Sequence, residues 1–299
     1  MSARAPVSIT VSGVARLFGR DVAALVDLAR RAEDAGVDQI ALTDHVLIGP
    51  RTDRYPYGRF PFPNDEPWPE PLVTLAAIAG ATRTIRLATA VLIAPLRSAA
   101  LLAKTVATLD ALSGGRVDLG VGVGWQKEEF EAAGVPFGRR TARTMDVLRA
   151  CRALWSASPA SFASDTVRFD SIWCEPRPVQ PGGVPLWLGV AASTRHVAHL
   201  VELDAGWLPV GADLDAIRDG VAKIRAGFAA AGRDPASLRV RANVAPALDA
   251  AGRVDLERTL AESAPATLAA GATLLAYPIA AYVRRPDDLP AFLARLGRV

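Results

Sequence analysis

Residues 98–124 of the chain read SAALLAKTVATLDALSGGRVDLGVGVG, and the fold class is decided by this stretch. Ser98 to Leu112 has the apolar spacing of a helix, which Ser113-Gly114-Gly115 ends. Val117 to Val123 is short and rich in valine, which is typical of a buried strand. A helix followed directly by a buried strand is the repeating unit of proteins in which helices cover a parallel sheet.

The same alternation continues through the rest of the chain. Strands are predicted at 7–11, 39–43, 85–93, 117–123, 185–190, 205–208, 238–244 and 273–276. Helices are predicted between 21 and 36 and at 71–81, 98–112, 126–133, 139–155, 194–203, 214–231, 256–261 and 287–296. Strict alternation implies parallel strands joined by helical crossovers, and the apolar run 85–93 fits a strand buried on both faces.

A length of 299 residues fits either two ordinary domains or one large one. Eight strand–helix units without a linker of distinct composition favour a closed barrel over an open doubly wound sheet. The sequence therefore predicts an α/β protein, a (β/α)₈ TIM barrel in which residues 1–299 form a single domain. The surplus length is expected in insertions at the C-terminal face of the barrel.

Two segments interrupt the alternation. Residues 49–70 hold six prolines with Tyr55, Tyr57, Phe60, Phe62 and Trp68 between them. A connection longer than about 12–15 residues is usually functional or disordered, and the aromatic content argues against disorder. Because it follows the second strand, this loop should lie at the C-terminal face, where barrels bind ligands. Residues 156–183 predict a small inserted hairpin beside the barrel mouth.

Composition excludes several classes of protein. Lys+Arg minus Asp+Glu is 34 − 31 = +3, and no long basic run is present, so a nucleic-acid-binding arm is not expected. No window of about 18 apolar residues is present, so no membrane span is expected. Met1 to Pro6 lacks the apolar run of a signal peptide. Cys151 and Cys174 do not have CxxC spacing and are read as free thiols, so we expect a cytoplasmic protein.

Histidines give one candidate site and one unremarkable pair. Thr43-Asp44-His45 closes the second strand, and a carboxylate beside an imidazole at a barrel strand end suits proton transfer or hydrogen bonding to a polar ring. The alternative is that Asp44 caps a turn and His45 is structural. His196 and His199 lack a third metal ligand nearby, so we expect ordinary surface histidines and no metal site.

Two small-residue turns follow strands. Gly120-Val121-Gly122-Val123-Gly124 would let backbone amides approach a ligand closely. It is not GxGxxG, because Trp125 stands at the third glycine position, so a nicotinamide Rossmann site is rejected. No P-loop or GxSxG motif is present in the sequence. Gly189-Val190-Ala191-Ala192-Ser193-Thr194 begins a helix, which suits a phosphate, although plain N-capping explains it equally well.

Residues 104–125, KTVATLDALSGGRVDLGVGVGW, followed by Glu128-Glu129-Phe130, closely resemble a signature of the luciferase-like monooxygenase superfamily. Supporting matches lie at 29–38, 44–46, 94–97 and 205–209, so the resemblance covers most of residues 20–210. Members of that superfamily are (β/α)₈ barrels that use reduced FMN or the deazaflavin coenzyme F420. The chain is most similar to the F420-dependent, actinobacterial branch.

The resemblance implies roles for particular residues. His45 would be the catalytic proton partner, and Asp44 would approach the deazaflavin ring. The third strand would carry a bulge with a non-proline cis bond between Ala90 and Val91 that backs the ring. The cofactor would also be lined by Gly122, Gly124, Trp125 and Glu128. The cofactor phosphate would be held by Gly189, Val190, Ala191, Ser193 and Thr194.

The sequence also departs from the superfamily. Trp125 stands where the sugar-phosphate dehydrogenases carry a glutamate proton donor, which disfavours that reaction. The phosphate turn reads Gly189-Val190-Ala191 and lacks the usual paired glycines, and Gly13-Val14-Ala15 replaces the usual Pro-Gln stretch.

We therefore predict an F420-dependent oxidoreductase that transfers hydride between deazaflavin and a small apolar or aromatic substrate. An FMNH₂-dependent monooxygenase and a cofactor-binding homologue without catalysis remain alternatives. A homodimer is expected, because relatives are often dimers.

Overall fold

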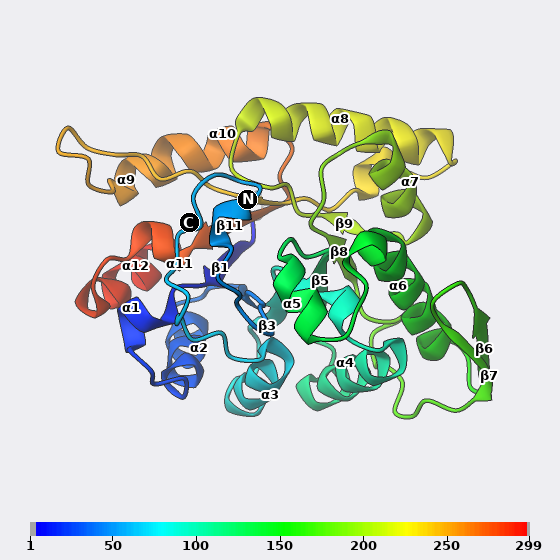
Figure 1. Ribbon diagram of the computed structural model, residues 1–299. Coiled ribbons are helices and arrows are strands. Elements are labelled where there is room, and N and C mark those ends of the chain that lie inside the picture. Colours follow the sequence, from blue (N-terminus) through cyan, green and yellow to red (C-terminus); the bar gives the residue numbers. More distant parts are fainter. Residues whose placement is uncertain (1–3, 298–299) are drawn as a thin grey trace.

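A computed structural model describes residues 4–297, which form a barrel of parallel strands inside a ring of helices (Figure 1). The prediction that Met1 to Pro6 is not part of a signal peptide falls partly on Met1 to Ala3, which lie outside the described residues. The hydrogen-bonded strand order is β10-β11-β1-β2-β3-β5-β8-β9, with β4 pairing beside β5. A parallel bridge between Trp207 and Val240 joins the two ends of this order. The predicted α/β barrel is confirmed.

The barrel strands are β1 (Val7–Val11), β2 (Gln39–Leu42), β3 (Arg86–Thr89), β4 (Leu92–Ile93), β5 (Val117–Gly122), β8 (Leu186–Leu188), β9 (Gly206–Trp207), β10 (Arg241–Asn243) and β11 (Leu274–Pro278). The helices are α1 (Val14–Phe18), α2 (Ala24–Asp34), α3 (Pro71–Ala81), α4 (Ala99–Ser113), α5 (Lys127–Ala132), α6 (Arg140–Ser156), α7 (Thr194–Glu202), α8 (Leu214–Ala230), α9 (Leu256–Arg258), α10 (Ala264–Ala269), α11 (Ile279–Tyr282) and α12 (Leu289–Leu296).

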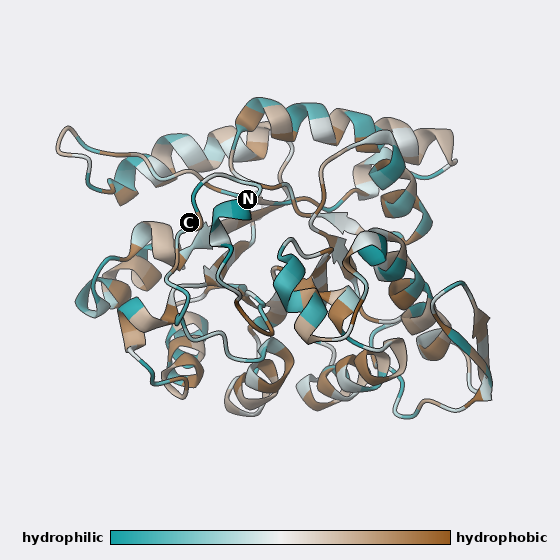
Figure 2. Cartoon of the chain, in the orientation of Figure 1, coloured by the Kyte–Doolittle hydropathy of each residue, from teal (hydrophilic) through white to brown (hydrophobic). Residues whose placement is uncertain are grey.

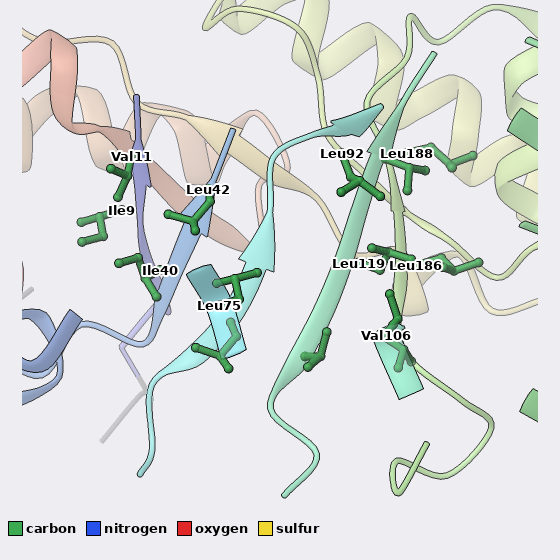
Figure 3. Close-up of a cluster of buried hydrophobic side chains, with 14 of the residues drawn as sticks. Ile9, Val11, Ile40, Leu42, Leu75, Leu92, Val106, Leu119, Leu186 and Leu188 are labelled. Atoms are coloured by element: carbon green, nitrogen blue, oxygen red, sulfur yellow. The ribbon is translucent and has the colours of Figure 1, made fainter. Parts of the chain in front are cut away.

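The main apolar core lies between the strands and the helices. Ile9, Ile40 and Leu119 on the strands are fully buried, as are Leu75 of α3 and Val106 of α4 (Figure 3). Apolar and polar residues alternate along the outer helices, because each helix has only one face on the sheet (Figure 2). Burial of these apolar faces is the dominant favourable contribution to folding.

The apolar run 85–93 is not one strand. Between the pairs Ala88–Asp118 and Leu92–Val121, the β3–β4 side has residues 89–91 and the β5 side has only 119–120. The extra residue makes a bulge, which ends β3 and restarts the chain as β4. The bond from Ala90 to Val91 within this bulge is a non-proline cis peptide, as the resemblance implied.

The second insertion forms the expected hairpin, β6 (Ala160–Ala163) with β7 (Arg168–Ile172). The hairpin was expected beside the barrel mouth, but none of its residues lines the cavity there. The insertion leaves the C-terminal end of α6 and therefore starts at the N-terminal end of the barrel, because crossover helices run antiparallel to the strands. The hairpin lies along the outside of α6, where Thr166 donates to Asp146 and Asp165 pairs with Arg139.

Smaller differences occur near the two ends of the chain. The short helix α1 follows β1 where no helix was predicted. Its first turn is tied to the loop 49–70, because the backbone N–H of Ala15 donates to Glu66 at 3.0 Å. The helix predicted at 256–261 is instead longer and irregular: α9, a π-helical turn at Thr259–Ser263, and α10.

The interior of the barrel is polar at the N-terminal ends of the strands. Ser8 donates to Gln39 at 2.8 Å, Gln39 donates to Asp118 at 2.8 Å, and Arg86 pairs with Asp118 at 2.7 Å. Arg241 joins this network from β10 by donating to Ser8 at 2.9 Å. The composition of the strands did not predict these contacts, because they join residues that are far apart in the chain.

Candidate active site

A cavity of about 620 Å³ opens at the C-terminal ends of the strands. That volume is within the range of about 300–1,000 Å³ usual for small-molecule and cofactor sites. The loop 49–70 covers it as predicted. Six aromatic residues line the cavity: Tyr55, Tyr57, Phe60, Phe62, Trp68 and Trp125. Several are in edge-to-face contact, with 5.2 Å between the ring centres of Tyr55 and Trp125.

His45 is held in one orientation at the cavity wall. It directly follows Asp44 at the end of β2, and only 8% of it is exposed. Its Nδ1 lies 3.1 Å from Oε2 of Glu129, whose side chain is fully buried. The remaining ring nitrogen, Nε2, has no hydrogen-bond partner within residues 4–297, and His45 lines the cavity. Because Nδ1–H is donated to the carboxylate, Nε2 is the nitrogen available for chemistry.

Glu129 is a candidate site residue that was not predicted from the sequence. Its second oxygen, Oε1, accepts the backbone N–H of Val46 at 2.6 Å and of Leu47 at 3.3 Å. One carboxylate therefore fixes both the imidazole and the chain that follows it. The signal was present, since Glu128 and Glu129 both lie in the matched signature, but the sequence does not say which glutamate faces inward.

Glu128 was expected to line the cofactor, but it does not line the cavity. Its side chain packs beneath Gly49, where an added Cβ would lie 2.6 Å from the Cβ of Glu128. Its Oε1 lies 3.7 Å from Arg54. A helical residue points about 100° away from its neighbour, so α5 directs Glu129 to His45 and Glu128 towards the loop.

Asp44 lines the cavity, but its oxygens are already engaged. Oδ2 accepts from Arg97 at 2.6 Å and from the backbone N–H of Ile93 at 2.8 Å, and Oδ1 accepts from Arg97 at 3.1 Å. This buried pair connects the end of β2 with β4, directly after the bulge. Arg97 also donates to Glu70, which begins α3. The principal contacts of Asp44 are therefore with the protein itself.

Ala90, Val91, Gly122, Gly124 and Trp125 all line the cavity. Gly122 and Gly189 make room for the side chain of Val91, since a Cβ on either would lie 2.5 or 2.7 Å from it. Gly124 has φ +74°, a conformation that favours glycine. Gly122 and Gly189 therefore make room for the side chain of Val91 and also line the cavity, so their expected contact with a ligand stays a prediction.

The predicted phosphate turn is divided by the structure. Gly189 lines the main cavity. Val190 lines a separate small cavity, and Ala191, Ser193 and Thr194 are exposed on the rim. Ser193 caps α7 through a hydrogen bond from the N–H of His196. The N–H groups of Thr194 and Arg195 have no acceptor within the described part of the chain, so they are available to an anion at this helix start.

His196 and His199 are not ordinary surface histidines. Both are partly buried and line the small cavity with Val190. Burial lowers the pKa of His199. Across residues 4–297, no cluster of three or more His, Cys, Asp or Glu side chains is arranged to hold a metal ion. Cys151 and Cys174 are free and buried.

Comparison with known proteins gives a family match. The model of the luciferase-like monooxygenase family matches residues 5–275. An uncharacterized protein of Mycobacterium tuberculosis is 36% identical over 233 residues, which are 75% of this chain and 80% of that protein. Two shorter matches are each 32% identical: an FMNH(2)-dependent dimethylsulfone monooxygenase of Pseudomonas putida, over 52% of this chain and 43% of that protein, and an F420-dependent glucose-6-phosphate dehydrogenase of Amycolatopsis mediterranei, over 55% and 46%.

Solved structures share the fold. The monooxygenase RslO1 from Streptomyces bottropensis has a TM-score of 0.75 at 19% identity, covering 98% of this chain and 96% of that one. The coenzyme F420-dependent tetrahydromethanopterin reductase from Methanopyrus kandleri has a TM-score of 0.73 at 18% identity, covering 99% and 98%. Among the helices of the described residues, none is long and apolar enough to cross a membrane.

Proposed function

The chain belongs to the luciferase-like monooxygenase family, and from this we propose that it is a coenzyme F420-dependent oxidoreductase acting on a small organic substrate. The observation that carries the proposal is the His45–Glu129 pair, which presents one imidazole nitrogen to a cavity of cofactor size. Bound F420 would supply or accept a hydride. A hydride added to a carbonyl must be matched by a proton on oxygen, and His45 is placed to provide it.

The residues present fit such a cofactor. The cavity is large enough for a tricyclic ring, and Ala90, Val91 and Trp125 give it a wall of backbone and aromatic surface. The free N–H groups at the start of α7 would hold a phosphate, and Arg195 adds a positive charge there. These residues would bind and orient the cofactor.

His45 and Glu129 have different roles in this proposal. His45 is the catalytic residue, because its Nε2 can accept a proton in the neutral form or donate one as imidazolium. Glu129 is a positioning residue that fixes the tautomer and the ring plane through Nδ1. The aromatic side chains of the loop 49–70 would exclude water and contact an apolar substrate body.

The choice of F420 over FMN rests on the resemblance of the sequence to the F420-dependent branch and on the charge of the cavity. The charged side chains that line it are Arg16, Asp44 and Arg241, with His45 as the titratable neighbour. Asp44 is paired with Arg97, and Arg16 donates to the backbone carbonyls of Ala280 and Val283, so the positive charge of Arg16 suits the anionic tail of F420. The two relatives with shorter matches, one FMNH(2)-dependent and one F420-dependent, favour neither cofactor, because each has the same sequence identity to this chain.

Titration of the purified protein with F420 and with FMN, each oxidised and reduced, tests the proposal through cofactor fluorescence and thermal unfolding. We expect F420 to bind at least tenfold more tightly. A ligand at 100 times its Kd should stabilise the protein by about 2.7 kcal/mol. Tighter binding of FMN would instead favour the monooxygenase. Absence of both quenching and stabilisation would favour a homologue without catalysis.

A further inference from the structure

Arg241 is a buried cation at the floor of the cavity. It is 5% exposed and lies on β10. Its guanidinium donates to Ser8 at 2.9 Å, to Thr10 at 2.7 Å and to Gln39 at 3.1 Å. All three partners are uncharged. Burial lowers the pKa of Arg241 to about 10, so the side chain is a cation at neutral pH.

No carboxylate in the described residues forms an ion pair with Arg241. Asp118 lies nearby but is bonded to Arg86 and Gln39. Asp44 also lines the cavity, but Arg97 and the N–H of Ile93 take both of its oxygens. A buried charge without a counter-charge is costly, so a group from outside the chain is the natural partner.

Arg241 lines the cavity, and its guanidinium is only partly hydrogen-bonded to the protein. The three hydrogen bonds use Nε and Nη2, and Nη1 has no partner within residues 4–297. Asn243, two residues further along β10, also lines the cavity. The guanidinium is already fixed by Ser8, Thr10 and Gln39, so little ordering entropy is lost when Nη1 binds a ligand.

We propose that the substrate carries a carboxylate, which Nη1 of Arg241 and the amide of Asn243 bind at the cavity floor. This rests on the proposed function and names the substrate class of that same site: a small acid with an apolar or aromatic body. The body lies against Phe60, Trp68 and Trp125, and the carboxylate neutralises the floor. Charge-assisted hydrogen bonds from arginine to carboxylate are among the stronger polar contacts in proteins.

The test compares acids with the uncharged amides of the same shape. The probes are 3-phenylpropanoate with 3-phenylpropanamide and 4-phenylbutanoate with 4-phenylbutanamide, titrated by calorimetry into wild-type protein with and without F420. We expect each acid to bind at least tenfold more tightly than its amide. Equal affinities of acid and amide for the wild type would overturn the proposal.

Two variants locate the effect. Arg241→Met should remove the preference for the acid and leave amide affinity within about twofold. Asn243→Asp places a carboxylate beside Arg241 and should weaken acid binding at least tenfold, again without affecting the amide. Arg225→Met is the control, because Arg225 is exposed on α8 and does not line the cavity. If Arg241→Met fails to fold, the wild-type comparison and Asn243→Asp decide the question.

Titration of the same variants with F420 shows whether Arg241 binds the substrate or the cofactor. Loss of F420 affinity in Arg241→Met, with acid and amide bound equally by the wild type, would assign the arginine to the cofactor and overturn the substrate proposal. Failure of F420 to bind the wild type would overturn the proposed function alone, because the acid preference is also measured on the free protein.

Discussion

Nδ1 of His45 and Oε2 of Glu129 lie 3.1 Å apart, although 84 positions separate the two residues in the chain. One follows β2 and the other lies in α5, and both are buried. Carboxylate–imidazole pairs of this kind fix which ring nitrogen meets the ligand. Substitution of either residue therefore tests the chemistry proposed for this cavity.

Replacement of His45 by Ala should lower turnover about 100-fold or more, the usual contribution of a proton-transfer group. F420 affinity should stay within a few-fold, because the cavity walls made by Val91 and Trp125 are intact. Oxidation of reduced F420 by 4-formylbenzoate, with benzaldehyde as the uncharged comparison, gives the rate, and fluorescence quenching gives the affinity. Unchanged turnover would show that His45 is structural.

Replacement of Glu129 by Gln should lower turnover about 10- to 100-fold and change the shape of the pH–rate profile, because the imidazole loses its charged partner. The matched control is Glu128→Gln, one residue away, which should leave the rate within about twofold since Glu128 lies outside the cavity. Equal effects of the two substitutions would contradict the positioning role of Glu129.

Removal of the Asp44 carboxylate should destabilise the protein by about 3 kcal/mol, because the part-buried Arg97 would lose its main partner and keep only the exposed Glu70. Urea unfolding of Asp44→Ala measures this loss. Asp27→Ala removes an exposed carboxylate that pairs with Arg31 and should change stability by less than about 0.5 kcal/mol. A small effect at Asp44, with lost cofactor affinity, would show that it serves the ligand instead.

A methyl group at Gly122 should destabilise the protein by about 1–3 kcal/mol, because it would lie 2.5 Å from the side chain of Val91. Shortening that neighbour in the double variant Gly122→Ala, Val91→Ala should recover most of the loss. Gly80→Ala is the control, since no atom lies within 4 Å of the added Cβ there. Additive losses in the double variant would mean that the two positions do not compete for space.

The contribution of Glu33 to the stability of the protein should depend on pH in the acidic range. Burial alone would raise the pKa of its carboxyl, but the backbone N–H groups of Ile85, Thr84 and Arg83 outweigh this and lower the pKa from 4.5 to about 2. A lowered folded-state pKa adds stability that is present above pH 4.5 and is lost as the pH falls towards 2.

Glu33→Gln should therefore lower the free energy of unfolding by about 1 kcal/mol at pH 7. That difference should shrink between pH 4.5 and 2 in urea titrations. The neighbouring exposed Asp34→Asn serves as the control and should show no comparable dependence. A difference that stays constant down to pH 2 would rule out the ionised carboxylate as its source.

The order of helices and strands was accessible from the sequence because it depends on residues that are close together in the chain. The run Val117 to Val123 is short and rich in valine, with Asp118 as its one charged residue, and Ser113-Gly114-Gly115 ends the helix before it. The long loop 49–70 was also placed correctly, since a loop after a parallel strand must emerge at the C-terminal face. The cis bond at Ala90 came from family resemblance, not from the local pattern.

Tertiary structure alone decided which side chains meet. Glu128 and Glu129 are equivalent as a pattern, and the packing of α5 on the barrel determines which one reaches His45. Arg241 looks like an ordinary strand residue until the closed barrel places Ser8, Thr10 and Gln39 around it. The local sequence pattern determines where helices and strands form. The contacts between side chains depend on how each helix is rotated against the sheet and on closure of the barrel, because both result from packing between segments that are distant in the chain.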